Sequence, residues 1–220
     1  MKKVIITGST GMIGSLILEH CLVSPEVETV TSLVRRASGI RHEKLNEVII
    51  DDFTALDEKA PYFKSVDTVY YCLGVYTGAV DRDLFRKITV DYPDTLAKVL
   101  YRNNPNLTFC LLSGGGADRN ERSRMIFAKD KGTIENKISK MGFKSFHAFR
   151  PGYIYPVTPR EEPNLSYRLY RFFYPLIKLL GPNTSVRSTD LAKAMFNAGI
   201  KGCDLEIIEN KDVLPLINQP

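Results

Sequence analysis

Cysteine and histidine are both scarce in this chain. Its 220 residues include four cysteines and three histidines, with no Cys-x-x-Cys pair. Zinc sites need several such ligands at short, regular spacing, so the sequence offers no basis for a metal centre. Cys72 and Cys110 fall in apolar, strand-like runs, where a reduced cysteine acts as a small hydrophobic residue. This pattern argues against a disulfide framework and for a reducing compartment.

Long hydrophobic runs are also missing. The apolar run at residues 4–6 stops at Thr7-Gly8, which is too short for a signal peptide. No run approaches the roughly 20 residues of a membrane span. We therefore expect a cytoplasmic protein with no membrane partner.

The excess of positive charge is modest. Lysine and arginine number 30 against 25 aspartate and glutamate residues, a net charge of +5 at pH 7. The basic residues are scattered, which suits an anionic small ligand better than a nucleic acid. Hydrophobic residues make up 44% of a chain that shows no linker or repeat, so we expect one soluble domain over residues 1–220.

Short apolar runs alternate with helical patterns through the first two-thirds of the chain. We expect strands at 2–6, 29–34, 47–50, 67–74, 107–113 and 145–150, and helices at 12–23, 81–102 and 123–142. Such alternation is typical of a parallel α/β sheet. Pro93 is expected to bend or interrupt the second helix because it lacks an N–H group. The sequence predicts a doubly wound, Rossmann-type sheet with helices on both faces.

The pattern changes after Pro151. A proline-rich loop is followed by an amphipathic helix over 165–181, a helix over 190–200 and a last strand over 204–209. Ser188-Thr189-Asp190 is expected to cap the helix over 190–200. We interpret residues 151–188 as a small cap on the substrate side of the same domain.

The glycine-rich stretch "TGSTGMIG" carries the clearest functional signal. Gly8, Gly11 and Gly14 lie between the first strand and its helix. The first would permit the tight turn, the second would let a pyrophosphate approach the backbone, and the third would let the helix pack close to the sheet. The spacing is G-x-x-G-x-x-G rather than G-x-G-x-x-G. Its place between strand and helix predicts a dinucleotide site.

The end of the second strand decides which dinucleotide is favoured. NAD-binding folds carry an acidic side chain there, which bonds the ribose 2′-hydroxyl. This chain has Arg35 and Arg36 instead, with no carboxylate nearby. Two guanidinium groups suit a 2′-phosphate, so NADP is favoured over NAD. Asp52, or Asp51 in its place, is expected near the adenine amine, and Gly74 near the nicotinamide ribose.

These features together resemble the short-chain dehydrogenase/reductase superfamily in its atypical branch, and are similar to the Tat-interacting-protein-like oxidoreductase group. The resemblance runs over nearly the whole chain, through "TGSTGMIG", "DDFTALD", "DTVYYCLG", "LFRKITVDY", "LLSGGGADRNERS", "KGTIE", "FRPGYIY" and "STDLA". It implies the fold and a nicotinamide cofactor. The cofactor contacts that we expect are Gly8, Ser9, Thr10, Gly11, Met12, Ile13, Arg35, Arg36, Asp52, Phe53, Leu73, Gly74, Lys131, Pro151 and Gly152.

The resemblance also implies a catalytic tyrosine, a lysine one helical turn later and a serine at the end of the fifth strand. Lys131 matches the lysine, which bonds the nicotinamide ribose in the family. Phe127 stands at the tyrosine position. Gly114 stands where the catalytic serine is usual, and Ser113 matches the serine before it. Lys131 and Ser113 are therefore the remaining candidate catalytic residues.

No other tyrosine restores the motif. Tyr174-x-x-x-Lys178 has the spacing but is interrupted by Pro175 and lacks the preceding strand and serine. Tyr76, Tyr153 and Tyr155 lie in loops that face the pocket in such folds, although packing in the cap is the simpler interpretation for each.

Two functions stay open. The first is an NADP-binding protein with little dehydrogenase activity, acting as a cofactor sensor or on a protein partner. The second is an NADPH-dependent oxidoreductase with an unusual acid, or with a small-molecule acceptor that needs none. The resemblance is compatible with a homodimer and does not identify a substrate.

Overall fold

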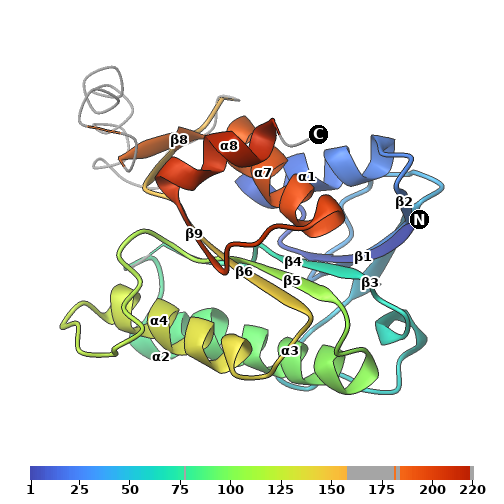
Figure 1. The fold of residues 1–220 in the computed structure, drawn as a ribbon. Helices are drawn as coiled ribbons and strands as arrows, with labels where there is room; N and C mark the ends of the chain where they lie inside the picture. Colours follow the sequence, from blue (N-terminus) through green and yellow to red (C-terminus); the bar gives the residue numbers. More distant parts are fainter. Residues whose placement is uncertain (77, 158–180, 182–183, 219–220) are drawn as a thin grey trace.

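A seven-stranded parallel sheet forms the centre of the computed structural model (Figure 1). The structure describes residues 1–76, 78–157, 181 and 184–218. The strand order is β3-β2-β1-β4-β5-β6-β9. The chain therefore reverses direction across the sheet between β1 and β4, which is the switch point where doubly wound sheets bind ligands. The predicted fold class is confirmed.

The strands lie close to their predicted positions. They are β1 (Lys2–Thr7), β2 (Val27–Val34), β3 (Leu45–Ile49), β4 (Thr68–Tyr71), β5 (Thr108–Leu112), β6 (Ser145–Arg150) and β9 (Ile207–Glu209). The largest differences are at the end of β4, where the expected strand 67–74 stops at Tyr71, and at the start of β9, where the expected strand 204–209 begins at Ile207. Residues 72–74 lie beyond the end of the strand and line a cavity.

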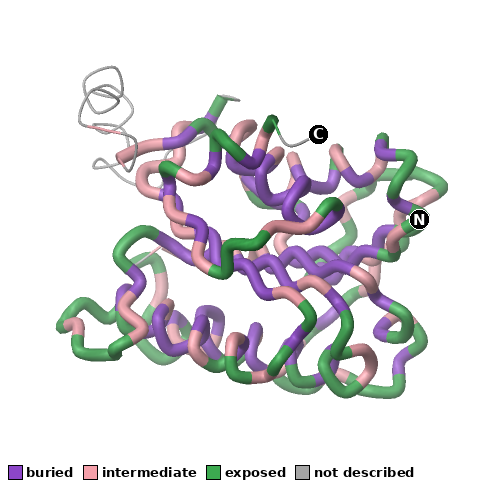
Figure 2. The backbone as a smooth tube through the Cα atoms, viewed as in Figure 1, coloured by how far each residue is buried: buried purple, intermediate pink, exposed green. Residues whose placement is uncertain are grey.

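Helices cover both faces of the sheet. On one face, α1 (Met12–Val23), α7 (Ser188–Lys201) and α8 (Val213–Ile217) pack together, and on the other lie α2 (Arg82–Arg86), α3 (Tyr92–Asn103) and α4 (Ile126–Ser139) (Figure 1). Short 3-10 turns stand at Pro61–Phe63 and Asn210–Asp212. Figure 2 shows the strands as a buried layer between the helices. Apolar runs such as Val4–Ile6 and Thr68–Tyr71 thus form strands covered on both faces.

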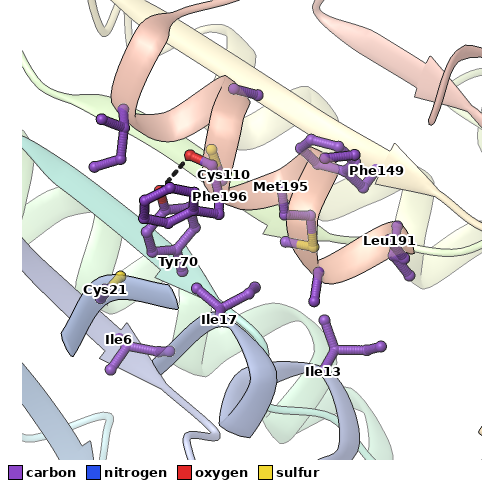
Figure 3. Close-up of a cluster of buried hydrophobic side chains, with 14 of the residues drawn as sticks. Ile6, Ile13, Ile17, Cys21, Tyr70, Cys110, Phe149, Leu191, Met195 and Phe196 are labelled. Atoms are coloured by element: carbon purple, nitrogen blue, oxygen red, sulfur yellow. Dashed lines mark hydrogen bonds between the residues drawn. The ribbon is translucent and has the colours of Figure 1, made fainter. Parts of the chain in front are cut away.

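Each face has its own hydrophobic cluster. Ile13, Ile17, Leu191 and Met195 meet between α1 and α7 (Figure 3). Tyr70 belongs to the same cluster. Its hydroxyl donates a 2.9 Å hydrogen bond to the carbonyl oxygen of Phe196. This bond satisfies a polar group that is fully buried. The opposite cluster joins α3 and α4 to the sheet.

The predicted break near Pro93 takes the form of a π-helical turn. Lys87–Asp91 is wound as a π-helix between α2 and α3, and Pro93 lies in the first turn of α3. Pro93 has no N–H to donate to the preceding turn. The π-helical turn is wider than an α-helical one, and it lets the helical path continue without that hydrogen bond.

The predicted cap for the late helix is wrong. Ser188 is the first residue of α7, and no side-chain hydrogen bond caps that helix. The Ser188 hydroxyl instead accepts a 3.1 Å hydrogen bond from the backbone N–H of Val157. In the described part of segment 151–188, β7 (Tyr153–Tyr155) and β8 (Ser185–Arg187) form a separate two-stranded sheet. The helix predicted over 165–181, with Tyr174 and Lys178, falls on residues outside the described ranges apart from Gly181.

Candidate functional site

The glycine loop is packed tightly enough to exclude side chains at two of its three glycines. Gly8 has a φ of +68°, and a Cβ atom there would lie 2.7 Å from the carbonyl carbon of Cys72. A Cβ atom on Gly14 would lie 2.1 Å from the carbonyl oxygen of Gly8. Both contacts are with backbone, which cannot move aside. The loop therefore brings the start of α1 against the carboxyl end of β1, as its sequence predicts.

A cavity of about 720 Å³ opens on one side of this loop. It lies at the carboxyl ends of β4, β5 and β6, beside the switch point. Its lining residues are Gly11, Met12, Ile13, Cys72, Leu73, Gly74, Val75, Tyr76, Leu112, Ser113, Gly114, Gly115, Gly116, Phe127, Lys131, Arg150, Pro151, Gly152, Ile154 and Glu209. The structure thus gathers Gly11, Ser113, Phe127 and Lys131, which are far apart in sequence, around one space.

A second cavity of about 450 Å³ opens on the other side of the loop. Gly8, Ser9 and Thr10 form one wall, and Arg35 and Arg36 lie at the end of β2. The remaining lining residues are Leu33, Val34, Ala37, Phe53 and Leu73. Leu73 lines both cavities, so a ligand longer than either one could run from the arginines past the glycine loop into the larger space.

Asp52 lines neither cavity. Its carboxylate accepts hydrogen bonds from the backbone N–H of Thr54 at 2.8 Å and the Thr54 hydroxyl at 2.7 Å, and it forms an ion pair with Lys87 at 3.3 Å. The bonds from Thr54 and from Lys87 hold the pKa of Asp52 below its ordinary value. Its neighbour Phe53 is the residue that reaches the smaller cavity. The carboxylate thus closes a local turn, and the structure gives no contact for its predicted adenine role.

Gly74 lines the larger cavity as expected, but nothing lies within 4 Å of a Cβ atom placed there. Among the described residues, neither crowding nor a positive φ requires glycine at this position.

Phe127 and Gly114 are complementary in shape. A Cβ atom on Gly114 would lie 2.4 Å from Cζ of the Phe127 ring and 3.3 Å from its Cε1. The ring therefore occupies the space that a serine side chain at residue 114 would need. A larger residue at position 114 would therefore require the Phe127 ring to move.

Lys131 lies one turn after Phe127 on α4 and faces the larger cavity. Its ammonium group donates a 3.1 Å hydrogen bond to the carbonyl oxygen of Leu112. Burial lowers the pKa of this lysine to about 8, although the charge of Glu135 and the thiol of Cys72 act in the opposite direction. The preceding residue, Asp130, is fully buried and bound by Arg82 and Arg86, so its carboxylate is already engaged.

Ser113 belongs to a buried ionic cluster. Its hydroxyl donates to the carboxylate of Glu135, which is fully buried. The same carboxylate accepts from Nε of Arg119 at 2.9 Å and from Nη2 of Arg150 at 2.5 Å. Arg150 also pairs with Glu209 at 3.2 Å, and both residues line the cavity. The polar wall beside Ser113 is therefore held by two carboxylates and two guanidinium groups.

Sequence reasoning missed this cluster. Glu135 lies in "KGTIE" and Arg150 in "FRPGYIY", two of the quoted motifs, but nothing in those motifs indicates that the two side chains meet. The order of strands brings them together, because β6 lies beside β5 and α4 connects the two. The motif glycine Gly132 explains part of the arrangement. A Cβ atom there would lie 1.8 Å from the carbonyl oxygen of Asp118, so only glycine lets α4 pack against the 118–119 backbone.

The three tyrosines proposed as substitute acids separate in the structure. Tyr76 lines the larger cavity, whereas Tyr153 and Tyr155 are not among its lining residues. The residue between them, Ile154, does line it. Alternate residues of a strand point to opposite sides, so β7 directs Ile154 to the cavity and its two tyrosines elsewhere.

The described residues lack both a metal-binding cluster and a membrane-spanning helix. They contain no group of three or more His, Cys, Asp or Glu side chains that could hold a metal ion. No helix in these ranges is long and apolar enough to cross a membrane.

Known proteins were compared with the chain and the fold. Residues 4–122 match the NAD dependent epimerase/dehydratase family. Protein HTATIP2 of Rattus norvegicus is 30% identical over 220 residues, covering 98% of this chain and 89% of the relative. Protein fmp52, mitochondrial, of Emericella nidulans is 26% identical, covering 94% of this chain and 91% of the relative.

The solved structures with this fold are more distant. Gre2 of Candida albicans in complex with NADPH superposes with a TM-score of 0.68 at 14% identity, covering 95% of this chain and 78% of that one. MoeE5 in complex with UDP-glucose and NAD gives the same TM-score at 15% identity, covering 94% and 74%. At these identities the likeness concerns the fold alone.

Proposed function

Because the chain belongs to the NAD dependent epimerase/dehydratase family, we propose that it binds NADP(H) as an atypical short-chain dehydrogenase/reductase and uses the cofactor mainly as a regulatory ligand. The family membership confirms the resemblance found in the sequence. The observation that carries the regulatory part is the contact of Phe127 with Gly114. A ring without a hydroxyl fills the place where the family keeps its proton donor and serine.

The residues present fit a dinucleotide. The tightly packed glycine loop separates two cavities of about 450 and 720 Å³ that share Leu73. The amides at the start of α1 suit the negative charge of a pyrophosphate. Lys131 and the 72–74 segment would hold the nicotinamide half, and the smaller cavity would hold the adenosine half. When bound, a nicotinamide cofactor supplies or accepts a hydride.

The smaller cavity supports NADP over NAD. Arg35 and Arg36 line it, both are exposed, and neither forms a salt bridge with any described residue. No aspartate or glutamate is among its lining residues. Two uncommitted guanidinium groups can bind a 2′-phosphate, while no carboxylate is there to bind a 2′-hydroxyl.

A second candidate function is an NADPH-dependent oxidoreductase. The larger cavity has room for more than a nicotinamide ring, and a cationic side chain, Lys131, faces it. A positioned general acid contributes about 10²–10⁴ in rate, so its loss slows a reductase without removing the hydride donor. A homodimer, a protein partner and a location in the cytoplasm stay predictions.

Calorimetric titration with NADPH, NADP, NADH and NAD tests the binding proposal. We expect the phosphorylated forms to bind at least tenfold more tightly, about 1.4 kcal/mol. Arg35→Ala with Arg36→Ala should remove this preference. Arg41→Ala is the matched control, because Arg41 is exposed on the same connection but lines neither cavity. Equal affinities for NADP and NAD, or an equal loss of both in the double variant, would contradict the 2′-phosphate argument.

The regulatory part is tested by turnover. We expect NADPH oxidation with simple carbonyl acceptors to stay well below the 1–10³ s⁻¹ that is typical of enzymes. A rate within that range would favour the second candidate function.

A further inference from the structure

The larger cavity retains one ammonium group after the loss of the family's tyrosine. We propose that Lys131 itself donates the proton to a carbonyl oxygen bound in this cavity, in place of the missing tyrosine. In the family pattern the lysine binds the ribose and assists the tyrosine, so direct donation is a different role. The inference rests on the proposed cofactor binding and deepens the second candidate function.

The two neighbours that could have donated are not able to do so. Phe127 has no exchangeable proton. The single hydroxyl proton of Ser113 is committed to Glu135, whose carboxylate also accepts from Arg119 and Arg150. A carboxylate bound by two guanidinium groups is ionised and only accepts hydrogen bonds. Ser113 can therefore offer a ligand only its lone pairs.

Lys131, in contrast, has donors to spare. An ammonium group has three N–H bonds, and one of them is used on the carbonyl oxygen of Leu112. Within the described ranges Lys131 forms no salt bridge, because Asp130 is engaged by Arg82 and Arg86, and Glu135 by Arg119 and Arg150. The bond to Leu112 places the ammonium beside the segment 112–114, where the Phe127 ring also ends.

The surroundings also make Lys131 a better acid than an exposed lysine. Burial lowers its pKa to about 8, against the effects of Glu135 and Cys72. At neutral pH the group still carries its proton, and it releases that proton more readily than an ordinary lysine. Such a pKa, close to the working pH, suits a general acid. The titratable and charged groups around it are Glu135 on α4, Cys72 and Tyr76 after β4, Arg150 on β6 and Glu209 on β9.

Other donors in the cavity wall are less suited. The guanidinium of Arg150 does not give up a proton in proteins, and its two carboxylate partners raise its pKa further against the opposing effect of burial. Burial raises the pKa of the Cys72 thiol, which makes it a weaker acid. Tyr76 is the remaining rival, and the experiment below includes it.

The step balances as an aldehyde reduction. The carbonyl carbon receives a hydride from the reduced nicotinamide, and the carbonyl oxygen receives a proton from Lys131 as an N–H bond breaks. The products are an alcohol, the oxidised cofactor and a neutral lysine, which then takes a proton from water. The ammonium is the active form, so the rate should be constant below the pKa of Lys131 and fall as the pH rises through it.

The test compares Lys131→Arg with Lys129→Arg, a change at an exposed lysine of the same helix. Arginine keeps the charge and the donors for a ribose but cannot release a proton. With 4-nitrobenzaldehyde as acceptor, we expect Lys131→Arg to lower kcat about 100-fold or more while the NADPH affinity changes by less than about threefold. Lys129→Arg should leave kcat unchanged, and Tyr76→Phe should keep the wild-type dependence of the rate on pH. The wild-type rate should fall about tenfold per pH unit above pH 8.

A second readout needs no turnover. In NMR titration of cofactor-free protein with ¹³Cε-labelled lysine, one resonance should titrate near pH 8 and be absent from Lys131→Arg. Full kcat in Lys131→Arg, a flat wild-type pH profile to pH 10, loss of the fall in rate above pH 8 in Tyr76→Phe, or no aldehyde reduction at all would each overturn the proposal. Calorimetric binding of NADPH is measured separately, so the failure of cofactor binding is distinguishable from the failure of Lys131 as an acid.

Discussion

Arginines lie beside both cavities, but they differ in solvent exposure and in ion pairing. Beside the smaller cavity, Arg35 and Arg36 are exposed and without carboxylate partners among the described residues. At the wall of the larger cavity, Arg150 is 12% exposed and bound to Glu135 and Glu209. The first pair can meet a ligand without breaking an existing bond, whereas Arg150 is already part of the protein's own structure. The same residue type thus indicates binding on one side of the glycine loop and stability on the other.

The difference extends to the rest of each region. Beside the smaller cavity, the tightly packed glycine loop and the arginines after β2 lie where the sequence predicts them. Beside the larger cavity, Gly132 packs against the 118–119 backbone and Glu135 is bound to Arg150, whereas the family resemblance implies that the proton-handling groups at residues 114 and 127 are changed. In the proposed function the groups that bind a 2′-phosphate, Arg35 and Arg36, are separate from the proton donor Lys131, so either can be altered without the other.

The largest effect should come from removing Arg150. Arg150→Met leaves the buried Glu135 carboxylate with Arg119 as its remaining cation and frees Glu209. Losing one partner of a buried ion pair costs about 3–5 kcal/mol. In a chain of this size that corresponds to a fall in Tm of roughly 6–20 °C in calorimetry without ligand. A fall under 2 °C would show that the cluster is not structural and would remove the contrast between the two regions.

A smaller effect is expected from the contact between Gly114 and Phe127. Gly114→Ser would place its Cβ atom 2.4 Å from Cζ of the ring, and such overpacking costs about 1–3 kcal/mol. In a Phe127→Ala background the serine has room, so its cost should fall by at least about 1 kcal/mol. The measurement is a double-mutant cycle in urea. Additive effects would mean that the two departures from the family pattern are independent.

The sequence was a sound guide to the fold because periodicity records which residues are buried. The apolar run at residues 4–6 forms the predicted strand. The glycine triplet forms the predicted tight turn between that strand and its helix. The break before Pro93 was expected, but its form as a π-helical turn was not. The cap on α7 was wrong because serine can use its hydroxyl on a distant backbone amide, here that of Val157, instead of its own helix.

The candidate site was only partly predictable. Motif positions indicated several residues that line the larger cavity, including Lys131 and the 151–152 segment. They did not show that Ser113 would be bound by Glu135, or that Asp52 would close a turn with Thr54. Such hydrogen bonds depend on side-chain directions across neighbouring elements, which spacing along the chain does not encode.

A pH-dependent contribution is expected from the loop between β5 and α4. The Asp118 carboxylate accepts hydrogen bonds from the backbone N–H groups of Asn120, Arg122 and Ser123. These bonds, that of Ser123 foremost, lower the pKa of Asp118. A lowered folded-state pKa stabilises the protein above the ordinary aspartate value of about 3.9, and this contribution is lost as the pH falls through the folded-state pKa. Asp118→Asn should therefore lose less stability than the wild type between pH 5 and pH 3 in urea titrations. Parallel acid profiles would show that the turn does not depend on the charge.

The smallest change in stability should come from the arginines that line the smaller cavity, when no ligand is present. Arg35→Ala with Arg36→Ala removes two exposed side chains that have no ion pair in the described structure, and such surface changes are usually within about 0.5 kcal/mol. The Tm of the cofactor-free double variant should match that of Arg41→Ala to within about 2 °C. With saturating NADP the wild type should gain stability through ligand binding, and the double variant should gain less. A marked loss of stability without ligand would mean that these arginines also support the fold. The arginines beside both cavities would then stabilise the fold, and they would differ only in how exposed they are.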